Sequence, residues 1–224
     1  TKYKDMGTLY FLFGIWLGMI GSFFSILICL KFSQINSISN NNQLYNVNVT
    51  IPAFIMIFFM TMPTVIGGFG KWMIPMMMGC PGMSFPSLNN FSFWLLPPSF
   101  IIMICRFIIN NGTGTGWNIY PPLSNNFGHN NISGDLNIFF LHLAGIFSIL
   151  GANNFICPIL NMMPNNMKLN QNPFFPWSIL ITAIFLILFS PVLGGGFTML
   201  LTDGKLNTSF FFPAGGGALY LFHP

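Results

Sequence analysis

The sequence predicts an all-α, polytopic membrane helix bundle, and its charge, hydropathy and apolar run lengths carry that prediction. The 224 residues include only seven basic and three acidic ones, so 4% are charged, whereas a soluble domain typically carries about 25%. Hydrophobic residues reach 53% and gather in five stretches long enough to cross the hydrocarbon of a bilayer. Backbone polar groups in lipid must be satisfied within the segment, so each stretch is predicted to be a helix.

The five predicted helices follow one another along a single membrane domain, residues 1–224. Charged residues close three of them: Lys31 follows the first, Lys71 with Trp72 the second, and Asp203 the fifth. The third precedes an outer loop rich in Gly, Pro and aromatic residues, a composition typical of an ordered connection. The predicted segments are helices at about 7–30, 47–70, 91–109, 136–163 and 177–202, the ordered outer loop at 110–135, and the truncated start of a further segment at 203–224.

Prolines and termini complete the prediction of the fold. Pro63 and Pro191 lie inside predicted helices, which membrane helices tolerate because neighbouring groups take up the freed carbonyls. Neither Thr1 nor Pro224 is typical of a natural terminus, so we expect the chain to be a fragment of something longer. With the N-terminus on the inner side, the inner segments would hold Lys2, Lys4, Lys71 and Lys168, and the outer ones Lys31, Arg106 and Lys205.

Several function classes are excluded by the same residues. The basic side chains form no cluster, so the sequence gives no sign of a nucleic-acid partner. The four cysteines lack CxxC spacing, so neither a disulfide framework nor a zinc site is predicted. No paired carboxylates, activated nucleophile or phosphate-binding loop is present, and therefore no catalytic residue is assigned.

Polar residues inside predicted spans are the remaining candidates, because they are costly in lipid. His142 is expected to be a hydrogen-bonded structural residue and not a metal ligand. Asn154 either lines a chain of water molecules or bonds a neighbouring helix, since an amide both donates and accepts. The residues alone thus indicate a polytopic membrane protein and nothing sharper.

Short strings along the whole chain say more. They are KDMGTLY at 4–10, GGFGKW at 67–72, NNFSFWLLPP at 89–98, GTGTGW at 112–117, LHLAG at 141–145 and LLTD at 200–203. In this order and spacing the chain resembles an N-terminal fragment of cytochrome c oxidase subunit I, of the haem–copper oxidase family, in its animal mitochondrial form.

The resemblance implies both an architecture and a role. It implies five transmembrane helices of a twelve-helix subunit, multi-pass in the mitochondrial inner membrane. The full subunit would hold two haems of the a type and a copper, and reduce oxygen to water with electrons from cytochrome c. It would couple this electron transport of the respiratory chain to proton pumping. Other oxidase subunits, cytochrome c and the lipid bilayer are the implied partners, with no nucleic acid.

Five positions match functional residues of the family. Tyr45 and Trp117 match residues around the low-spin haem and are the predicted cofactor-binding residues. Asn89 and Asn154 match polar residues of the proton channel, and Ser148 matches a nearby serine. These three are the predicted proton-pathway residues.

Other positions depart from the family pattern. Pro52 stands where the family has a His that is an axial ligand of the low-spin haem, and proline has no side-chain donor. Gly82 and Phe212 replace acidic residues, the first of which opens a proton channel, and Cys29 replaces an Arg near the haem formyl group. His223 resembles a copper ligand, but the string before it is shorter than in the family.

These departures leave alternatives open. The chain is either a degraded copy or erroneous sequence, or a genuinely diverged subunit. A non-catalytic membrane helix-bundle protein is the alternative from a different class. In each case the chain alone is expected to be inactive as an oxidase, because the downstream helices would hold further ligands.

Overall fold

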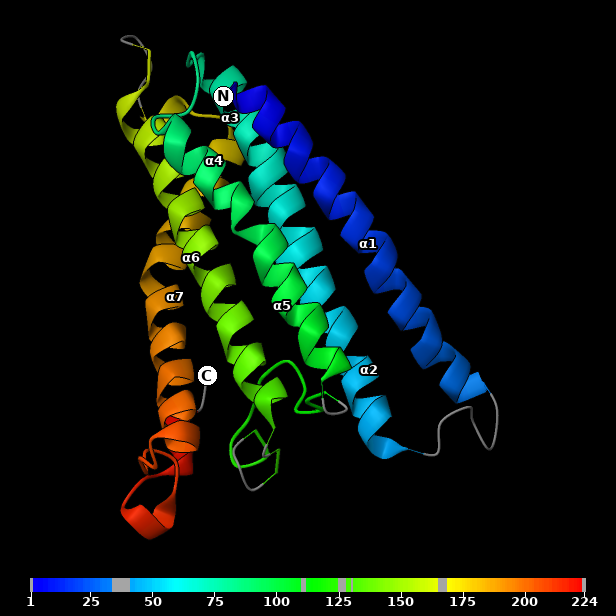
Figure 1. Ribbon diagram of the computed structural model, residues 1–224. Coiled ribbons are helices and arrows are strands. Elements are labelled where there is room, and N and C mark those ends of the chain that lie inside the picture. Colours follow the sequence, from blue (N-terminus) through cyan, green and yellow to red (C-terminus); the bar gives the residue numbers. More distant parts are fainter. Residues whose placement is uncertain are drawn as a thin grey trace. The chain divides into compact units, whose positions relative to one another are not determined.

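The computed structural model describes residues 2–33, 41–109, 112–124, 128–129, 131–164 and 169–222. These residues form helices, turns and loops, and no strand occurs among them (Figure 1). The elements are α1 (Tyr3–Ser33), α2 (Asn42–Phe54), the π-helix η1 (Ile55–Gly70), α3 (Lys71–Met78), α4 (Pro86–Trp94), α5 (Leu96–Ile108), α6 (Ile132–Asn161) and α7 (Phe174–Lys205), with 3-10 turns η2 (Leu169–Gln171), η3 (Pro213–Gly215) and η4 (Leu219–Phe222).

Five helical runs are long and apolar enough to cross a membrane. The predicted all-α, multi-pass membrane architecture is therefore confirmed for the part of the chain that the structure describes. The runs are Tyr3–Ser33, Asn42–Met78, Pro86–Ile108, Ile132–Asn161 and Phe174–Lys205.

The second run extends beyond the predicted 47–70 at both ends. It begins at Asn42 because the side chain of Asn41 accepts a hydrogen bond from the Gln43 backbone at 3.1 Å, which caps the helix. It continues through α3 to Met78 and stops at Gly79, whose φ of 66° is left-handed. Lys71, read from the sequence as the end of the span, lies within this run and is buried.

The fourth run begins at Ile132, earlier than the predicted 136. Asp135 consequently lies in the first turn of α6, where a carboxylate complements the helix dipole. Its Oδ2 forms an ion pair with Lys205 Nζ at 2.7 Å, which ties the start of α6 to the end of α7.

The chain divides into two compact units. Unit 1 comprises Thr1–Gly18, Met56–Pro98 and Leu143–Pro191, and unit 2 comprises Met19–Ile55, Ser99–His142 and Val192–Pro224. In unit 1, apolar residues of α3, α6 and α7 form one core, with Ile74, Phe155 and Ile179 almost completely buried.

Gly67 allows α1 to approach η1 closely within unit 1. A Cβ placed on Gly67 would lie 2.5 Å from Cδ1 of Tyr10, so no larger residue fits without movement. The missing side chain of Gly67 thus lets the aromatic face of α1 pack directly against η1.

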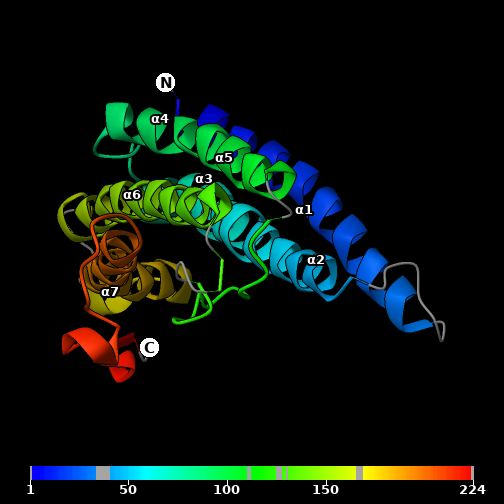
Figure 2. The ribbon, with the colours of Figure 1, turned by 60° about the horizontal axis from the view of Figure 1, so that its bottom comes forward.

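Unit 2 has its own aromatic core. Phe54 of α2 and Phe140 of α6 pack edge to face with ring centroids 5.0 Å apart. The C-terminal segment, red in Figure 2, follows the end of α7, where Asp203 accepts hydrogen bonds from the backbone N–H groups of Phe210 and Phe211. Phe222 then packs against Phe211 with ring centroids 5.5 Å apart.

Candidate functional site

A buried hydrogen-bond network in unit 1 centres on Ser92. Pro86 starts α4, which places Asn89 and Ser92 one turn apart on the same face. Ser92 Oγ donates to the Asn89 carbonyl at 2.9 Å and lies 3.0 Å from both Lys71 Nζ and Tyr10 Oη. Because the single hydroxyl proton of Ser92 is committed to Asn89, Lys71 and Tyr10 are both donors to Ser92.

Lys71 is the charged member of this network. Its side chain is 1% exposed, and Nζ lies 4.0 Å from the centroid of the Tyr10 ring. A cation over an aromatic face in a desolvated site gains about 2 kcal/mol. No carboxylate pairs with Lys71 in the described part of the chain, so the ring and the Ser92 hydroxyl are its identified partners.

Asn89 and Asn154 meet at the backbone of Phe85. Asn154 Oδ1 accepts from the Phe85 N–H at 3.0 Å, and the Asn89 N–H donates to the Phe85 carbonyl at 3.0 Å. Asn89 Oδ1 and Asn154 Nδ2 are buried without a hydrogen-bond partner among the described residues. One is an acceptor and the other a donor, a pairing that an ordered water would satisfy.

A small cavity adjoins the network in unit 1. Tyr10 and Lys71 line it from one side and Ser148 of α6 from another. About 20 Å³ is open to the centre of a water molecule, which is room for about one water. Ser148 Oγ donates to the Gly145 carbonyl at 2.7 Å, which leaves its lone pairs free to accept.

The structure therefore brings the three predicted proton-pathway residues into unit 1 in two groups. Asn89 and Asn154 share Phe85, and Ser148 shares a cavity with Lys71 and Tyr10. Ser92 joins the groups through its bond to Asn89. We call Asn154, Asn89, Ser92, Lys71, Tyr10 and Ser148 the polar row.

Sequence reasoning missed Tyr10, Lys71 and Ser92 as members of the row. Tyr10 and Ser92 are separated by 82 residues, and no short pattern links them. Lys71 carried a signal, because a charge within an otherwise apolar run is costly in lipid. That signal was read as a span boundary instead.

The predicted haem-side residues lie in unit 2. Tyr45 of α2 packs under Lys31, with Nζ 4.0 Å from the ring centroid, and edge to face with Phe32. Trp117 lies in the loop after α5 and is 55% exposed. Pro52 is buried in α2, two turns after Tyr45 and therefore on the same helix face.

Arg106 is a second buried cation, again missed from the sequence. It is completely buried, with its guanidinium 4.9 Å from the Phe54 ring, 4.5 Å from Phe107 and 5.6 Å from Phe140. All three guanidinium nitrogens lack a hydrogen-bond partner among the described residues. The three rings therefore supply its stabilisation through cation–π contacts.

The His, Cys, Asp and Glu side chains of the described residues do not gather into a metal-binding group. No group of three or more His, Cys, Asp or Glu residues occurs there. His142 Nδ1 lies 2.9 Å from the Ile138 carbonyl, to which it donates, in agreement with a structural role. His223, the predicted copper ligand, lies outside the described residues.

The fold and the polar row define a class of protein, a multi-pass α-helical membrane protein with polar side chains buried inside an apolar unit. Residues 5–222 match the family described as cytochrome c and quinol oxidase polypeptide I. The chain belongs to that family.

Two curated yeast relatives support the assignment. The chain is 48% identical over 219 residues to "Cytochrome c oxidase subunit 1" of Eremothecium gossypii, covering 97% of the chain and 41% of the relative. It is 45% identical over 224 residues to the protein of the same name from Yarrowia lipolytica, covering 99% of the chain and 42% of the relative. The chain thus spans about two fifths of the length of these relatives.

Proposed function

We propose that this chain is part of the catalytic subunit of a cytochrome c oxidase in the mitochondrial inner membrane. The full subunit would reduce oxygen to water with electrons from cytochrome c and couple this reaction to proton pumping. The family match over residues 5–222 is the observation that carries the proposal. The five membrane-spanning runs support it, because they supply the multi-pass frame that such a subunit needs.

Within that function we propose that the polar row conducts protons. Asn154 and Asn89 offer one unpartnered donor and one unpartnered acceptor in the same buried region. The cavity beside Ser148 has room for about one water, and a water bound there would extend the hydrogen bonding from the Ser92 network. Alternating donors and acceptors of this kind are what a proton relay through an apolar interior requires.

The low-spin haem does not fit the residue at the family's ligand position. Haem supplies electron transfer when it is bound, and its iron needs a side-chain donor such as imidazole. Pro52 has no such donor, and it is buried within α2 with its ring occupying the position. Tyr45 and Trp117, which match residues around this haem in the family, are proposed to contact it where it is bound.

A second candidate rests on the same residue. Pro52 together with Gly82, which lacks the carboxylate that the family uses, favours a degraded copy or a non-catalytic membrane helix-bundle protein. The two candidates differ in whether the chain assembles with other oxidase subunits.

Affinity purification of the full-length product from mitochondrial membranes tests the proposal. We expect other oxidase subunits to co-purify in stoichiometric amounts, because the chain matches the oxidase polypeptide I family and relatives that are named as subunits of cytochrome c oxidase. A Pro52→His variant expressed at the same level is the matched control. Recovery of the wild-type chain without other oxidase subunits would contradict the proposal.

A further inference from the structure

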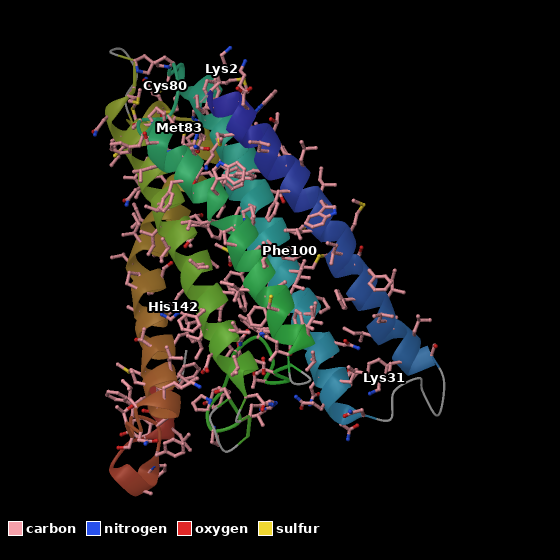
Figure 3. The ribbon with its side chains drawn as sticks, in the orientation of Figure 1. Lys2, Lys31, Cys80, Met83, Phe100 and His142 are labelled. Carbon is pink, nitrogen blue, oxygen red and sulfur yellow. The ribbon has the colours of Figure 1, made fainter. Side chains whose placement is uncertain are left out.

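Five sulfur-containing side chains gather at one end of unit 1. Met78, Cys80 and Met83 come from the end of α3 and the turn that follows, while Met162 and Met163 follow the end of α6. All five pack in or against the same cluster of buried residues. Figure 3 places Cys80 and Met83 close to each other where α3 gives way to α4. We call these five residues the sulfur cluster.

Backbone geometry explains why the turn brings sulfur inward. The left-handed Gly79 ends α3, and the Cys80 N–H donates back to the Pro75 carbonyl at 2.9 Å. Cys80 Sγ then donates to the Met162 carbonyl at 2.9 Å, and Ser84 Oγ donates to Met162 Sδ at 3.2 Å. The turn is therefore fastened to the end of α6 at Met162, and the Met162 thioether faces the turn.

The cluster is buried but accessible at its rim. Met78, Cys80 and Met83 are 1%, 8% and 7% exposed, and Met162 and Met163 are half-buried. Cys80, Met83, Met162 and Met163 lie between membrane-spanning runs, not within them. Met162 and Met163 are therefore the members of the cluster that remain partly open to solvent.

The chemistry of the donors selects the ion. Thiolate and thioether sulfurs are soft ligands and favour Cu(I), whereas Mg²⁺ and Ca²⁺ require oxygen ligands and Zn²⁺ binds thiolate, imidazole or carboxylate. One cysteine with several methionines therefore suits a monovalent soft ion. Methionines also fill irregular gaps in apolar cores, and a filling role alone would give no selective affinity.

We propose that the sulfur cluster binds one Cu(I) ion, with Cys80 Sγ as thiolate and the Met83 and Met162 thioethers as the other ligands. On binding, the S–H bond of Cys80 breaks, its proton leaves to solvent and a Cu–S bond forms. Copper stays Cu(I), so no oxidant or reductant is needed. The Met162 carbonyl loses the thiol donor, and the buried Met78 closes the apolar side. This proposal does not depend on the oxidase function.

Proton release makes the binding pH-dependent. Copper binds the thiolate form, so a proton competes with copper for the Cys80 sulfur. Apparent affinity rises about tenfold per pH unit while the free thiol is protonated, because one proton leaves per copper bound. Tyr3 is the titratable side chain among the hydrophobic neighbours of the cluster in the described residues.

Competition with bicinchoninate tests the site, using the full-length chain in detergent under anaerobic conditions with Cu(I) as the probe. We expect Cys80→Ser and Met83→Leu each to weaken the tightest binding, Cys80→Ser by more than about 100-fold, since even outer-shell partners cost 10–100-fold. Cys105→Ser in α5 and Met199→Leu in α7 are the matched controls and should bind as the wild type does. The pH dependence should disappear in Cys80→Ser.

Two results would overturn the proposal. One is equal Cu(I) affinity in the wild type, Cys80→Ser and Met83→Leu, which means binding by scattered exposed thioethers. The other is Zn(II) binding as tight as Cu(I). Thermal unfolding without copper establishes that the near-isosteric variants fold, and Cu(I) should then raise the melting temperature of the wild type and controls more than that of Cys80→Ser.

Discussion

Ser92 is the single acceptor that two buried donors share, so its removal has a calculable cost. In Ser92→Ala, Lys71 Nζ and Tyr10 Oη both lose a hydrogen bond of 3.0 Å in positions that are 1% and 2% exposed. A buried donor left unsatisfied costs about 1–3 kcal/mol, and more when it is charged, so two of them predict a loss of about 2–6 kcal/mol.

Lys71→Met is the matched variant. It keeps the unbranched apolar stem, removes the ammonium, and leaves Tyr10 donating to Ser92. Replacing a buried charge by an apolar side chain of similar volume is neutral or stabilising by about 1–4 kcal/mol. In the Lys71→Met background Ser92→Ala orphans only Tyr10, and its cost falls to about 1–3 kcal/mol.

Denaturant-induced unfolding of the full-length subunit in detergent, followed by tryptophan fluorescence, measures all four proteins of this double-mutant cycle. A positive coupling between Lys71 and Ser92 is expected. Equal costs of Ser92→Ala in both backgrounds, or a Lys71→Met variant less stable than Ser92→Ala, would refute the reasoning.

The remaining predictions concern three other places in the fold. Gly67→Ala puts a Cβ 2.5 Å from the Tyr10 ring and should lower the free energy of unfolding by about 1–3 kcal/mol. Gly194→Ala, whose Cβ would have no atom within 4 Å, should leave it unchanged or raise it by up to about 1 kcal/mol in the same unfolding assay. Burial raises the pKa of the Cys80 thiol, so the rate of its alkylation by iodoacetamide should be slow near neutral pH. The rate should still increase with pH in the range where the rate for an ordinary thiol has become constant. A pH–rate profile equal to that of an ordinary thiol would contradict this. Arg106→Met should leave the free energy of unfolding unchanged or raise it by about 1–4 kcal/mol, because the guanidinium has no hydrogen-bond partner among the described residues; a clear loss would reveal a partner.

The helices were predictable because membrane spans are set by apolar length and little else. The residues at which the helices begin and end were harder to predict. Lys71 follows a long apolar stretch, where a lysine is typically an interfacial anchor, and only the tertiary structure brings Tyr10 and Ser92 to its amine. Arg106 was counted outside the membrane for the same reason, whereas three phenylalanine rings surround it.

The candidate site was predictable only through resemblance. Asn89, Asn154 and Ser148 were assigned to a proton pathway by matching strings, and their role stays a prediction. Their shared surroundings, the Phe85 backbone and the cavity at Lys71, depend on contacts between distant segments that no local pattern encodes. The sulfur cluster was hidden in the same way, because Met162 lies 82 residues after Cys80.

The central claim is that Pro52 leaves the low-spin haem without one of its side-chain ligands. Reduced-minus-oxidised absorbance of the full-length subunit, purified with its partner subunits, measures low-spin haem directly. We expect no normal low-spin band in the wild type or in Pro52→Ala, which relaxes the helix without adding a donor, and we expect the band to be restored in Pro52→His. A full low-spin band in the protein that carries Pro52 would contradict it.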